Sequence, residues 1–523
     1  MKHRQILCLL AAALLLLSLL AGCSKPDAPE DGTRSAAQTQ TASHGESGSA
    51  RPGEPPEGQP GGTPPEGGPG GTPPEGGPGG TPPEGGPGGT PPEGGPGGTP
   101  PEGGPGGGPG GPGGPGGDTA VDYRGATVID APADESGLRC DSSSADESAL
   151  LVRTDGAVTL SQLSVTKTGD SDGGDACSFY GLNAAVLAKD GARLSISGGS
   201  VRSDARGANA LFCYGGNGGR NGAQGDGSTL TLRKLTVRTT GDGSGGVMTT
   251  GGGVTWAYDL DVETSGRSSA PIRTDRGGGT VYVDGGRYVS NGLGSPVIYS
   301  TAEIHAAKAT LISNLSEGVC IEGVNSIELT DCDLTASNTK RNGNATFLDS
   351  IMIYQSMSGD ADSGTSSFTM TGGSLTSKSG HVFHVTNTKA VITLSGVRIT
   401  NEDAENILLS VCADGWSGGG NAATLNAVGQ RLKGAVKVGS DSSLSLNLSE
   451  GSGFEGSIDG LITDASGKQV SAEAGSVTVT LDASSTWSLT ADSYVSAFHG
   501  DAANIRSNGH TLYVNGAPLG GTK

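Results

Sequence analysis

The chain has 523 residues and carries 54 acidic against 33 basic side chains, which gives a formal net charge of −21. Nucleic-acid-binding proteins present basic surfaces, so this balance argues against a nucleic acid partner. Glycine accounts for 95 residues and aromatic side chains for only 4% of the chain, which argues against a conventional core of large side chains.

The first 22 residues have the pattern of an export signal. A basic start at residues 2–4 is followed by an apolar run and by small residues before Cys23. We therefore expect residues 1–22 to be a signal peptide. The sequence Leu-Ala-Gly-Cys at 20–23 resembles the lipobox of bacterial lipoproteins, which implies that Cys23 becomes the lipidated N-terminus; an uncleaved apolar anchor is the alternative. No later run is long and apolar enough to span a bilayer, so we expect a lipid anchor in the cell membrane and an extracellular location.

Residues 23–118 are predicted to be a disordered linker rich in glycine and proline. The motif TPPEGGPGG occurs five times in tandem, beginning at Thr63, Thr72, Thr81, Thr90 and Thr99. Proline lacks a backbone donor and glycine raises the entropy cost of ordering, so the segment cannot form a core. A collagen helix is excluded because glycine does not occupy every third position. The linker would carry the following domain away from the membrane.

From residue 119 to 523 a repeating frame dominates. In each unit an aliphatic or small anchor residue precedes another apolar residue by five positions, and the anchors fall at 160, 196, 232, 257, 283, 306, 329, 370 and 394. The basic period is 23–26 residues and insertions account for the longer steps. The segments are short and alternate in polarity, as strands do. The pattern predicts an all-β solenoid, a right-handed parallel β-helix. A β-sandwich or a propeller is the alternative, although propeller blades repeat at about 40–50 residues.

The two ends of this region are expected to cap the solenoid, because terminal coils expose unpaired edges. Residues 119–148 would form the N-terminal cap, and the frame blurs from about residue 422, where we expect capping coils. Six cysteines lie in the domain, and they allow 15 disulfide pairings among which the sequence does not choose.

Four segments connect the domain to a known type of protein. "NAAVLAKDG", "GDGSGGVMTTGGG", "GSPVIYSTA" and "SLSLNLSEGSGFEGSI" resemble the parallel β-helix domains of adhesin-like bacterial surface lipoproteins. More distantly, the region resembles the pectate-lyase-like superfamily. The resemblance implies an extracellular β-helix engaged in adhesion or carbohydrate contact, and it supplies no catalytic residues.

One strand of each coil is flanked by insertions, at 170–180 and 338–348 before it and at 215–227, 357–366 and 412–421 after it. These loops would wall both sides of one sheet. If Ile272, Ile298, Ile321, Ile353 and Phe383 point inward, the residues that follow them point outward. That gives a row about 19 Å long by the strand spacing, which would suit an oligosaccharide and consists of Arg273, Tyr299, Glu322, Tyr354 and His384.

Two alternatives stand beside this ligand-binding row. In the first alternative, the five residues are ordinary exposed strand residues that bind nothing. In the second, the inward and outward assignment of the strands is wrong by one residue, and the five side chains are buried. Trp416, in a glycine-rich insertion, would add a face for sugar stacking or else anchor its loop. Trp256 and Trp487 lie in strand-like stretches, where we expect them to pack.

Signs of catalysis are weak. Only the segment 273–276, Arg-Thr-Asp-Arg, suggests a lyase base, and the paired aspartates of β-helix hydrolases are missing. His381 and His384 are expected on opposite strand faces, which makes them a poor metal pair. The acidic turns 171–175 and 358–364 would suit Ca²⁺ but lack the EF-hand spacing, so metal ligands stay unassigned.

The sequence therefore predicts a lipid-anchored, non-catalytic protein for adhesion or polysaccharide binding, whose partners are the membrane and a polysaccharide or cell-surface ligand. Two alternatives remain open. One is a calcium-dependent polysaccharide lyase or hydrolase that uses Arg273, and the other is a structural surface spacer.

Overall fold

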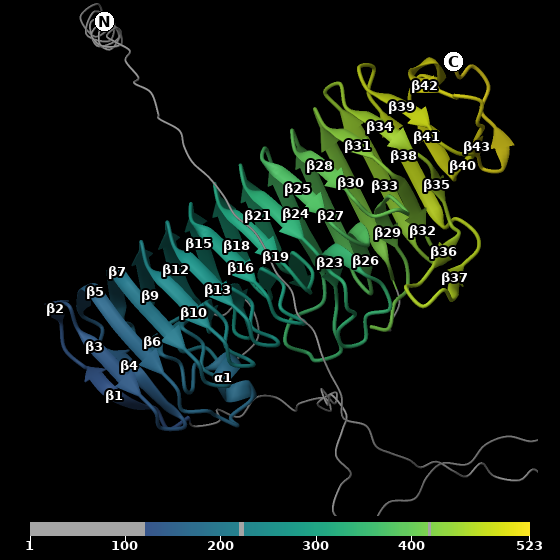
Figure 1. Cartoon of the computed structure of the whole chain (residues 1–523). Coiled ribbons are helices and arrows are strands. Elements are labelled where there is room, and N and C mark those ends of the chain that lie inside the picture. The colour runs from purple at the N-terminus through teal and green to yellow at the C-terminus, as the bar shows by residue number, and fades with distance from the viewer. Residues whose placement is uncertain (1–120, 219–223, 417–419) are drawn as a thin grey trace, which may run out of the picture. The chain divides into compact units, whose positions relative to one another are not determined.

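A computed structural model describes residues 121–218, 224–416 and 420–523. The expected signal peptide, Cys23 and the repeats of the linker lie outside the described residues. Within them, short strands stack in parallel, coil upon coil, to form a β-helix (Figure 1). The prediction of an all-β parallel solenoid is confirmed.

Each regular coil contributes three strands, one to each side of the solenoid. The first side is a 13-stranded parallel sheet, here called the first sheet. Its strands are β1 (Arg124–Ile129), β4 (Glu147–Arg153), β6 (Val186–Lys189), β8 (Leu211–Tyr214), β11 (Val247–Thr250), β14 (Ile272–Thr274), β17 (Ile298–Ser300), β20 (Val319–Glu322), β23 (Asp349–Tyr354), β26 (His381–Thr386), β29 (Ile407–Val411), β32 (Ala435–Val438) and β35 (Ile458–Asp459).

The other two sides belong mainly to a 22-stranded sheet, here called the second sheet. Its second-side strands are β2 (Ala133–Ser136), β5 (Ala157–Lys167), β7 (Arg193–Ser203), β9 (Thr229–Arg233), β12 (Gly253–Tyr258), β15 (Gly279–Asp284), β18 (Glu303–Ala307), β21 (Ser326–Thr330), β24 (Thr365–Thr371), β27 (Lys389–Ser395), β30 (Ala422–Val428), β33 (Ser443–Ser449), β38 (Ser476–Leu481) and β41 (Ala497–His499). β5 and β7 are long enough to run on into the third side.

The third side continues from coil to coil and passes into a separate four-stranded sheet near its end. Its strands are β3 (Arg139–Ser142), β10 (Thr236–Thr239), β13 (Asp261–Thr264), β16 (Arg287–Ser290), β19 (Thr310–Ser313), β22 (Asp333–Ala336), β25 (Ser374–Ser377), β28 (Arg398–Asn401), then β31 (Arg431–Lys433), β34 (Gly453–Gly456), β39 (Thr486–Leu489) and β42 (Ile505–Arg506).

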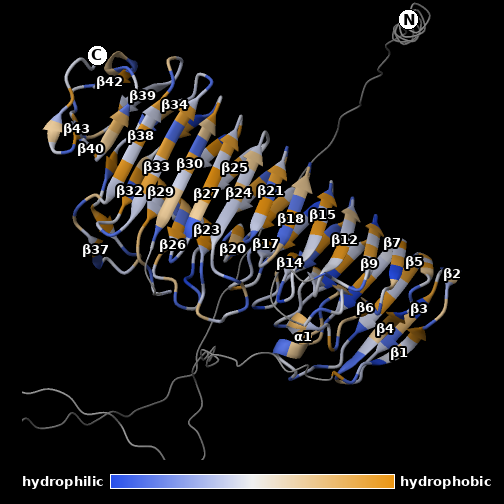
Figure 2. Cartoon of the chain, turned by 180° about the vertical axis from the view of Figure 1, so that it is seen from behind, coloured by the Kyte–Doolittle hydropathy of each residue, from blue (hydrophilic) through white to orange (hydrophobic). Residues whose placement is uncertain are grey.

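The register confirms the repeat frame read from the sequence. The nine anchor residues pair with one another from coil to coil, so they form a single buried column on the second side. Hydrophobic and hydrophilic residues alternate along the strands, as a half-buried strand requires (Figure 2). The interior is narrow and lined mainly by valine, leucine and isoleucine, which explains why the chain needs few aromatic residues.

The corner after this column is left-handed, and glycine fills four of its nine positions. The residue two positions after each of the nine anchors has a left-handed backbone conformation, with φ between 50° and 73°. Glycine adopts this conformation without strain, while asparagine and aspartate tolerate it better than most residues do. The residues are Gln162, Gly198, Lys234, Asp259, Gly285, Lys308, Asp331, Gly372 and Gly396.

The two ends of the solenoid terminate in different ways. At the N-terminal end β1 pairs with β4, and the edge strands β2 and β3 carry charged side chains that discourage edge pairing. Beyond residue 422 the parallel register continues through β30, β33, β38 and β41. The chain then closes with η1 (Ala502–Asn504) and the small sheet of β40 (Ser493–Val495), β43 (Leu512–Val514) and β44 (Ala517–Pro518).

Two elements interrupt the coils. The short helix α1 (Asp175–Phe179) lies in the insertion before β6, and the antiparallel hairpin of β36 (Ile462–Thr463) and β37 (Gln469–Ser471) follows β35.

All six cysteines of the described residues are buried and free, so none forms a disulfide there. In the part of the chain that is described, no helix is both apolar and long enough to cross a bilayer.

Candidate functional site

The predicted row on the first sheet is in fact two rows. Arg273 pairs with Tyr299, and the same row continues through Cys320 and Met352 to His384. Glu322 and Tyr354 pair with each other in a second row, two residues further along their strands. A shift of two residues keeps every side chain on its original face, so the hydrophobic pattern does not specify it.

The expectation that these side chains are open to solvent is wrong. All five point out of the coil, yet His384 is fully buried, Glu322 is 2% exposed and Tyr354 is 7% exposed. Arg273 and Tyr299 are half-buried. The insertions predicted to wall this sheet instead place their own side chains on it, as the contacts of Phe347, Trp416 and Asp360 show.

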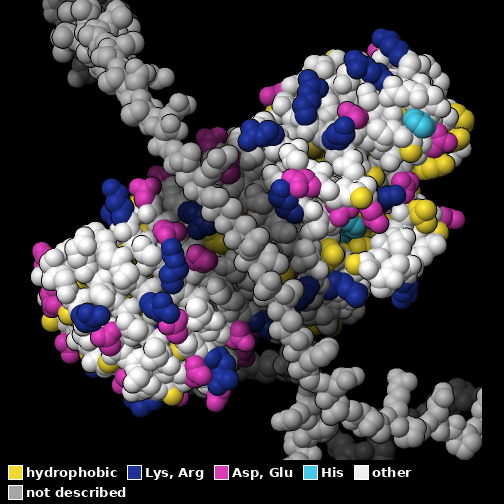
Figure 3. All heavy atoms as spheres, in the orientation of Figure 1, with side chains coloured by type: hydrophobic (Ala, Val, Ile, Leu, Met, Phe, Trp, Pro, Cys, Tyr) yellow, Lys and Arg dark blue, Asp and Glu magenta, His cyan; other side chains and the backbone are white. Residues whose placement is uncertain are grey.

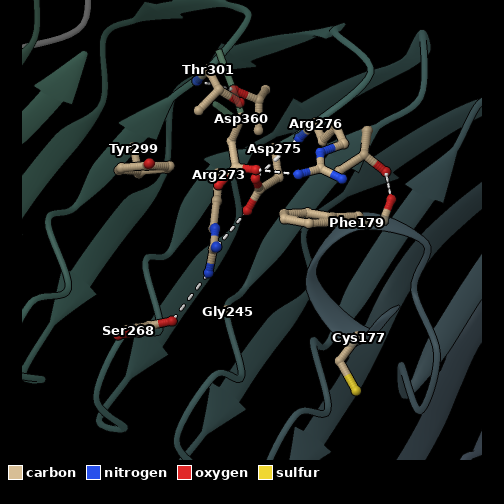
Figure 4. A network of polar contacts seen from close by, with 12 residues as sticks. Cys177, Phe179, Gly245, Ser268, Arg273, Asp275, Arg276, Tyr299, Thr301 and Asp360 are labelled. Atoms are coloured by element: carbon tan, nitrogen blue, oxygen red, sulfur yellow. Dashed lines mark hydrogen bonds and ion pairs between the residues drawn. The ribbon is translucent and has the colours of Figure 1, made fainter. Parts of the chain in front are cut away.

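The arginines of the segment 273–276 are held by ion pairs (Figure 4). A nitrogen of Arg273 lies 2.5 Å from a carboxylate oxygen of Asp275, and the same guanidinium donates to the backbone oxygen of Ser268. Arg276 pairs with Asp360 at 2.6 Å and lies 4.4 Å from the ring centre of Phe179. Arg276 thereby joins the insertion that holds α1 to the loop 357–366. Burial raises the pKa of Asp275 to about 6, although Arg273 opposes the shift.

Glu322 is held by hydroxyl groups. Tyr299 donates to its carboxylate at 2.5 Å and Tyr354 at 3.2 Å, and Ser356 and Ser358 donate from the loop above it. Burial raises the pKa of both tyrosines well above the usual value, which keeps the phenols protonated as donors. Trp416 is half-buried and packs against Tyr354 with ring centres 4.9 Å apart, so its indole anchors a loop.

The two histidines meet, contrary to the expectation that they lie on opposite faces. The Nδ1 atoms of His381 and His384 each lie 2.7 Å from the hydroxyl of Ser410, and both residues between them, Val382 and Phe383, belong to the buried core. The Nε2 atom of His384 lies 3.3 Å from Asp414, and Phe347 covers both rings. The cluster is buried, and its two histidines share the hydroxyl of Ser410.

An exposed aromatic cluster lies instead on the second side of the solenoid. Trp256 of β12, Tyr282 of β15 and His305 of β18 pair in register on consecutive coils. Their rings are nearly parallel: Trp256 and Tyr282 lie 6.1 Å apart at 11°, and Tyr282 and His305 lie 5.1 Å apart at 13°. We call these three residues the aromatic ladder.

The ladder presents ring surface to solvent. Tyr282 is 40% exposed, and Trp256 and His305 are partly exposed. Rings directly above one another would be separated by the strand spacing of about 4.8 Å, so the larger distance between Trp256 and Tyr282 implies a sideways offset of roughly 4 Å. The rings of Trp256 and Tyr282 are therefore offset and leave part of their facing surfaces uncovered, whereas the rings of Tyr282 and His305 overlap closely.

Polar groups border the ladder. The ring nitrogens of His305 contact Glu303 at 2.8 Å and Glu328 at 3.0 Å. Tyr258, next to Trp256 on the same strand face, lies under the guanidinium of Arg233 at 3.9 Å. The site therefore combines aromatic surface with charged hydrogen-bonding groups.

Two shallow pockets open beside these residues. The ladder pocket, of about 450 Å³, is lined by all three ladder residues together with Tyr258, Asp284 and Glu328. The corner pocket, of about 530 Å³, has a lining that includes Gly252, Gly278, Gly279, Glu303, Val324 and Asp362. Glu303 lines the corner pocket and contacts His305 of the ladder pocket, so the two pockets are neighbours on one face.

The ladder could have been found in the sequence. Trp256, Tyr282 and His305 each stand one residue before an anchor, at 257, 283 and 306, so period two places them together on the outer face. The sequence predicts instead that Trp256 packs, whereas the structure leaves it partly exposed. The expectation holds for Trp487, which is fully buried.

No group of three or more histidine, cysteine, aspartate or glutamate side chains that could hold a metal occurs among the described residues. The acidic turns 171–175 and 358–364 therefore gain no support as a calcium site.

Comparisons with protein-family models, with curated proteins and with solved structures found no match to this chain.

Proposed function

We propose that the protein binds polysaccharide on the outer face of β12, β15 and β18, as an exported, lipid-anchored and non-catalytic surface protein. The observation that carries the proposal is the partly exposed stack of Trp256, Tyr282 and His305 in an open pocket.

Sugar recognition needs the two features that this face combines. Aromatic rings offer apolar faces to the C–H side of a sugar, and tyrosine and tryptophan add polar tips. A few placed polar groups then fix orientation, and here Glu303 and Glu328 border the ladder. The ladder follows the solenoid axis over three rungs, about 10 Å by the strand spacing, so a glycan chain laid along the axis would contact the exposed edges of all three rings.

The N-terminal part of the chain fits this role. The signal-like start, the lipobox resemblance at Cys23 and the long linker favour a domain that is held at the cell surface and reaches outward. In this proposal, the lipid anchor and the linker determine how far the domain extends from the membrane, and the aromatic ladder contacts the polysaccharide.

We favour binding over cleavage because of how Arg273 is held. A lyase would need this residue as a free base, whereas its guanidinium is paired with Asp275 in a half-buried position. The surface that is open to a polymer lies on a different side of the solenoid.

The test is binding by a variant that lacks two rings. We expect Trp256→Ala/Tyr282→Ala to bind polysaccharide about 30-fold more weakly in affinity electrophoresis and calorimetry, at about 1 kcal/mol for each ring. Tyr494→Ala is the matched control, because Tyr494 is 45% exposed and stacks on Tyr513 at the far end of the chain. Unchanged binding by the double variant would show that the aromatic ladder is not the polysaccharide-binding site.

A further inference from the structure

We propose that Thr346 and Phe347 form a latch over the outer face of the first sheet, which stays closed while His381 and His384 together hold at most one proton and opens when acid protonates both rings. The inference concerns the first side of the solenoid and does not rest on the proposed polysaccharide site. It is carried by the hydrogen-bonding arrangement of the two buried rings.

The two rings share a single hydroxyl group. The Nδ1 atoms of His381 and His384 both lie 2.7 Å from Oγ of Ser410. The Nε2 atom of His384 lies 3.3 Å from Asp414, and neither of these two atoms has another partner. A neutral imidazole has one N–H donor and one acceptor nitrogen, a serine hydroxyl has one hydrogen, and an ionised carboxylate only accepts. In the neutral pair, His384 therefore directs Nε2–H to Asp414 and accepts from Ser410, while His381 donates from Nδ1.

This arrangement has room for one extra proton but not for two. If His381 alone is protonated, its Nδ1 still donates to Ser410 and the other contacts are unchanged. If both rings are protonated, both Nδ1 atoms carry hydrogen toward the same oxygen, and the hydrogen of Ser410 loses its acceptor. Two buried cations then lie with ring centres 6.2 Å apart, where their repulsion is poorly screened. The closed state therefore resists the second proton.

Most titratable groups around the rings are neutral or bound elsewhere. They come from the adjoining strands and loops and are Glu317, Asp349 of β23, Cys320 of β20, Lys437 of β32, Asp403, Cys412 and Asp414. Burial, and then Glu317, raises the pKa of Asp349, and burial raises the pKa of Glu317 and of both thiols. The carboxylate of Asp403 accepts from the backbone N–H groups of Gly380 and Glu405. These groups do not offset a charge on the rings.

The other two charges match the pair to a single proton. Lys437 disfavours a charge on His381 and is itself paired with Asp459 at 2.8 Å. The side chain of Asp414 is buried, and its pKa is lowered against burial by His384 and Thr346. One buried carboxylate thus balances one imidazolium. The pKa of His381, which burial and then His384 lower to about 3, agrees with this capacity.

The latch is held by the same groups. Phe347 packs over both rings, with its ring centre 5.3 Å from that of His381 and 4.8 Å from that of His384. Thr346 donates to Asp414 from its backbone N–H at 2.7 Å and from its hydroxyl at 2.6 Å. Disruption of the ring network therefore disturbs both the surface under Phe347 and the acceptor of Thr346.

The latch also covers a thiol. Phe347, Cys412 and Ile462 form one buried cluster, and the backbone N–H of Ala465, in the hairpin of β36 and β37, donates to the backbone oxygen of Thr346 at 3.0 Å. Cys412 is 1% exposed. Opening of the latch uncovers this thiol, so chemical labelling of Cys412 reports on the latch.

The size of the effect follows from proton linkage. With the latch open, His381 titrates near the usual pKa of 6.5, whereas the closed latch holds its pKa near 3. The closed state is therefore favoured above pH 6.5 and loses this advantage as the pH falls toward 3. The opening equilibrium rises about 25-fold between pH 7 and pH 5.

The response should persist in salt. Charges of both signs are interspersed over the face seen in Figure 3, and added salt screens exposed charges of this kind. The two rings are buried, so salt screens their interaction much less.

The experiment labels the thiols of the full protein with dithiodipyridine, which reacts with thiols in acid, and follows each cysteine by mass spectrometry at pH 7 and pH 5. We expect labelling of Cys412 in the wild type to rise about 25-fold more than in His381→Phe. Cys213, inside the solenoid, should stay unlabelled at both pH values. His499→Phe, at an exposed position, is the matched control and should keep the wild-type response.

A second variant separates the latch from the proton response. Thr346→Val removes one hydrogen bond and keeps both rings, so labelling of Cys412 should rise at both pH values with the ratio between them retained. An equal acid response in the wild type and His381→Phe would overturn the inference, as would the loss of this ratio in Thr346→Val. Protection of wild-type Cys412 at both pH values would also overturn it. So would labelling of Cys213 together with Cys412, because the whole domain would then unfold.

Discussion

His381 offers a sharp test of whether the outer face of the first sheet is closed. The ring is 6% exposed, lies 2.7 Å from Ser410 and has Phe347 above it at 5.3 Å. Burial, followed by the neighbouring His384, lowers the pKa of His381 to about 3 from the usual 6.5. The native state therefore keeps this ring neutral at a pH where the unfolded chain protonates it.

The direction and size of the effect follow from linkage. Because the native pKa is depressed, His381 contributes stability that is present above pH 6.5 and is lost as the pH falls toward 3, at about 1.4 kcal/mol for each pH unit. Between pH 7 and pH 5 the unfolded state gains about 2 kcal/mol from protonation, while the native state gains almost nothing.

The assay is urea unfolding of the wild type and His381→Phe at pH 7 and pH 5. The wild type should lose about 2 kcal/mol more than the variant over this interval. Taking the difference removes the contributions of buried groups that do not interact with His381, such as Glu317, whose pKa burial raises. If the two proteins lose equal stability, or if the His381 ring titrates near 6.5 by NMR, the closed face is refuted.

Three further predictions concern the scaffold. Gly286→Ala should destabilise the protein by well over 2 kcal/mol in urea unfolding, because φ is +90° and the new Cβ would lie 2.5 Å from a backbone oxygen. The control Gly396→Ala, with φ +64° and no atom within 4 Å, should cost only about 1 kcal/mol. Cys213, whose pKa burial raises to about 12, should resist alkylation at pH 8 until the protein unfolds; labelling of native protein by mass spectrometry would contradict this. Arg276→Ala should speed amide exchange in the loop 357–366, and unchanged exchange would mean that the ion pair does not hold the loop.

The scaffold could be predicted from the sequence because each coil repeats the same pattern of residues. An inward anchor, an outward residue before it and a left-handed corner two residues after it recur in nine units, so the register of the second side follows directly. The aromatic ladder occupies the outward positions before three of these anchors, although Trp256 was expected only to pack.

The first sheet was harder to read for two physical reasons. Val319 and Ile321 are both apolar and both buried in β20, so alignment of either with Ile298 keeps the inside and outside faces intact. The position of the inserted loops depends on long-range contacts, such as Arg276 with Asp360 and Trp416 with Tyr354, which join residues far apart in the chain. Sequence periodicity carries no information about such contacts.

A crystal structure of the protein with bound cellohexaose tests the central claim most directly. The account predicts a sugar ring packed against the exposed parts of Trp256 and Tyr282, with hydroxyl groups directed to Glu303 and Glu328. A hexasaccharide bound over the loops of the first sheet, with the ladder empty, would contradict it.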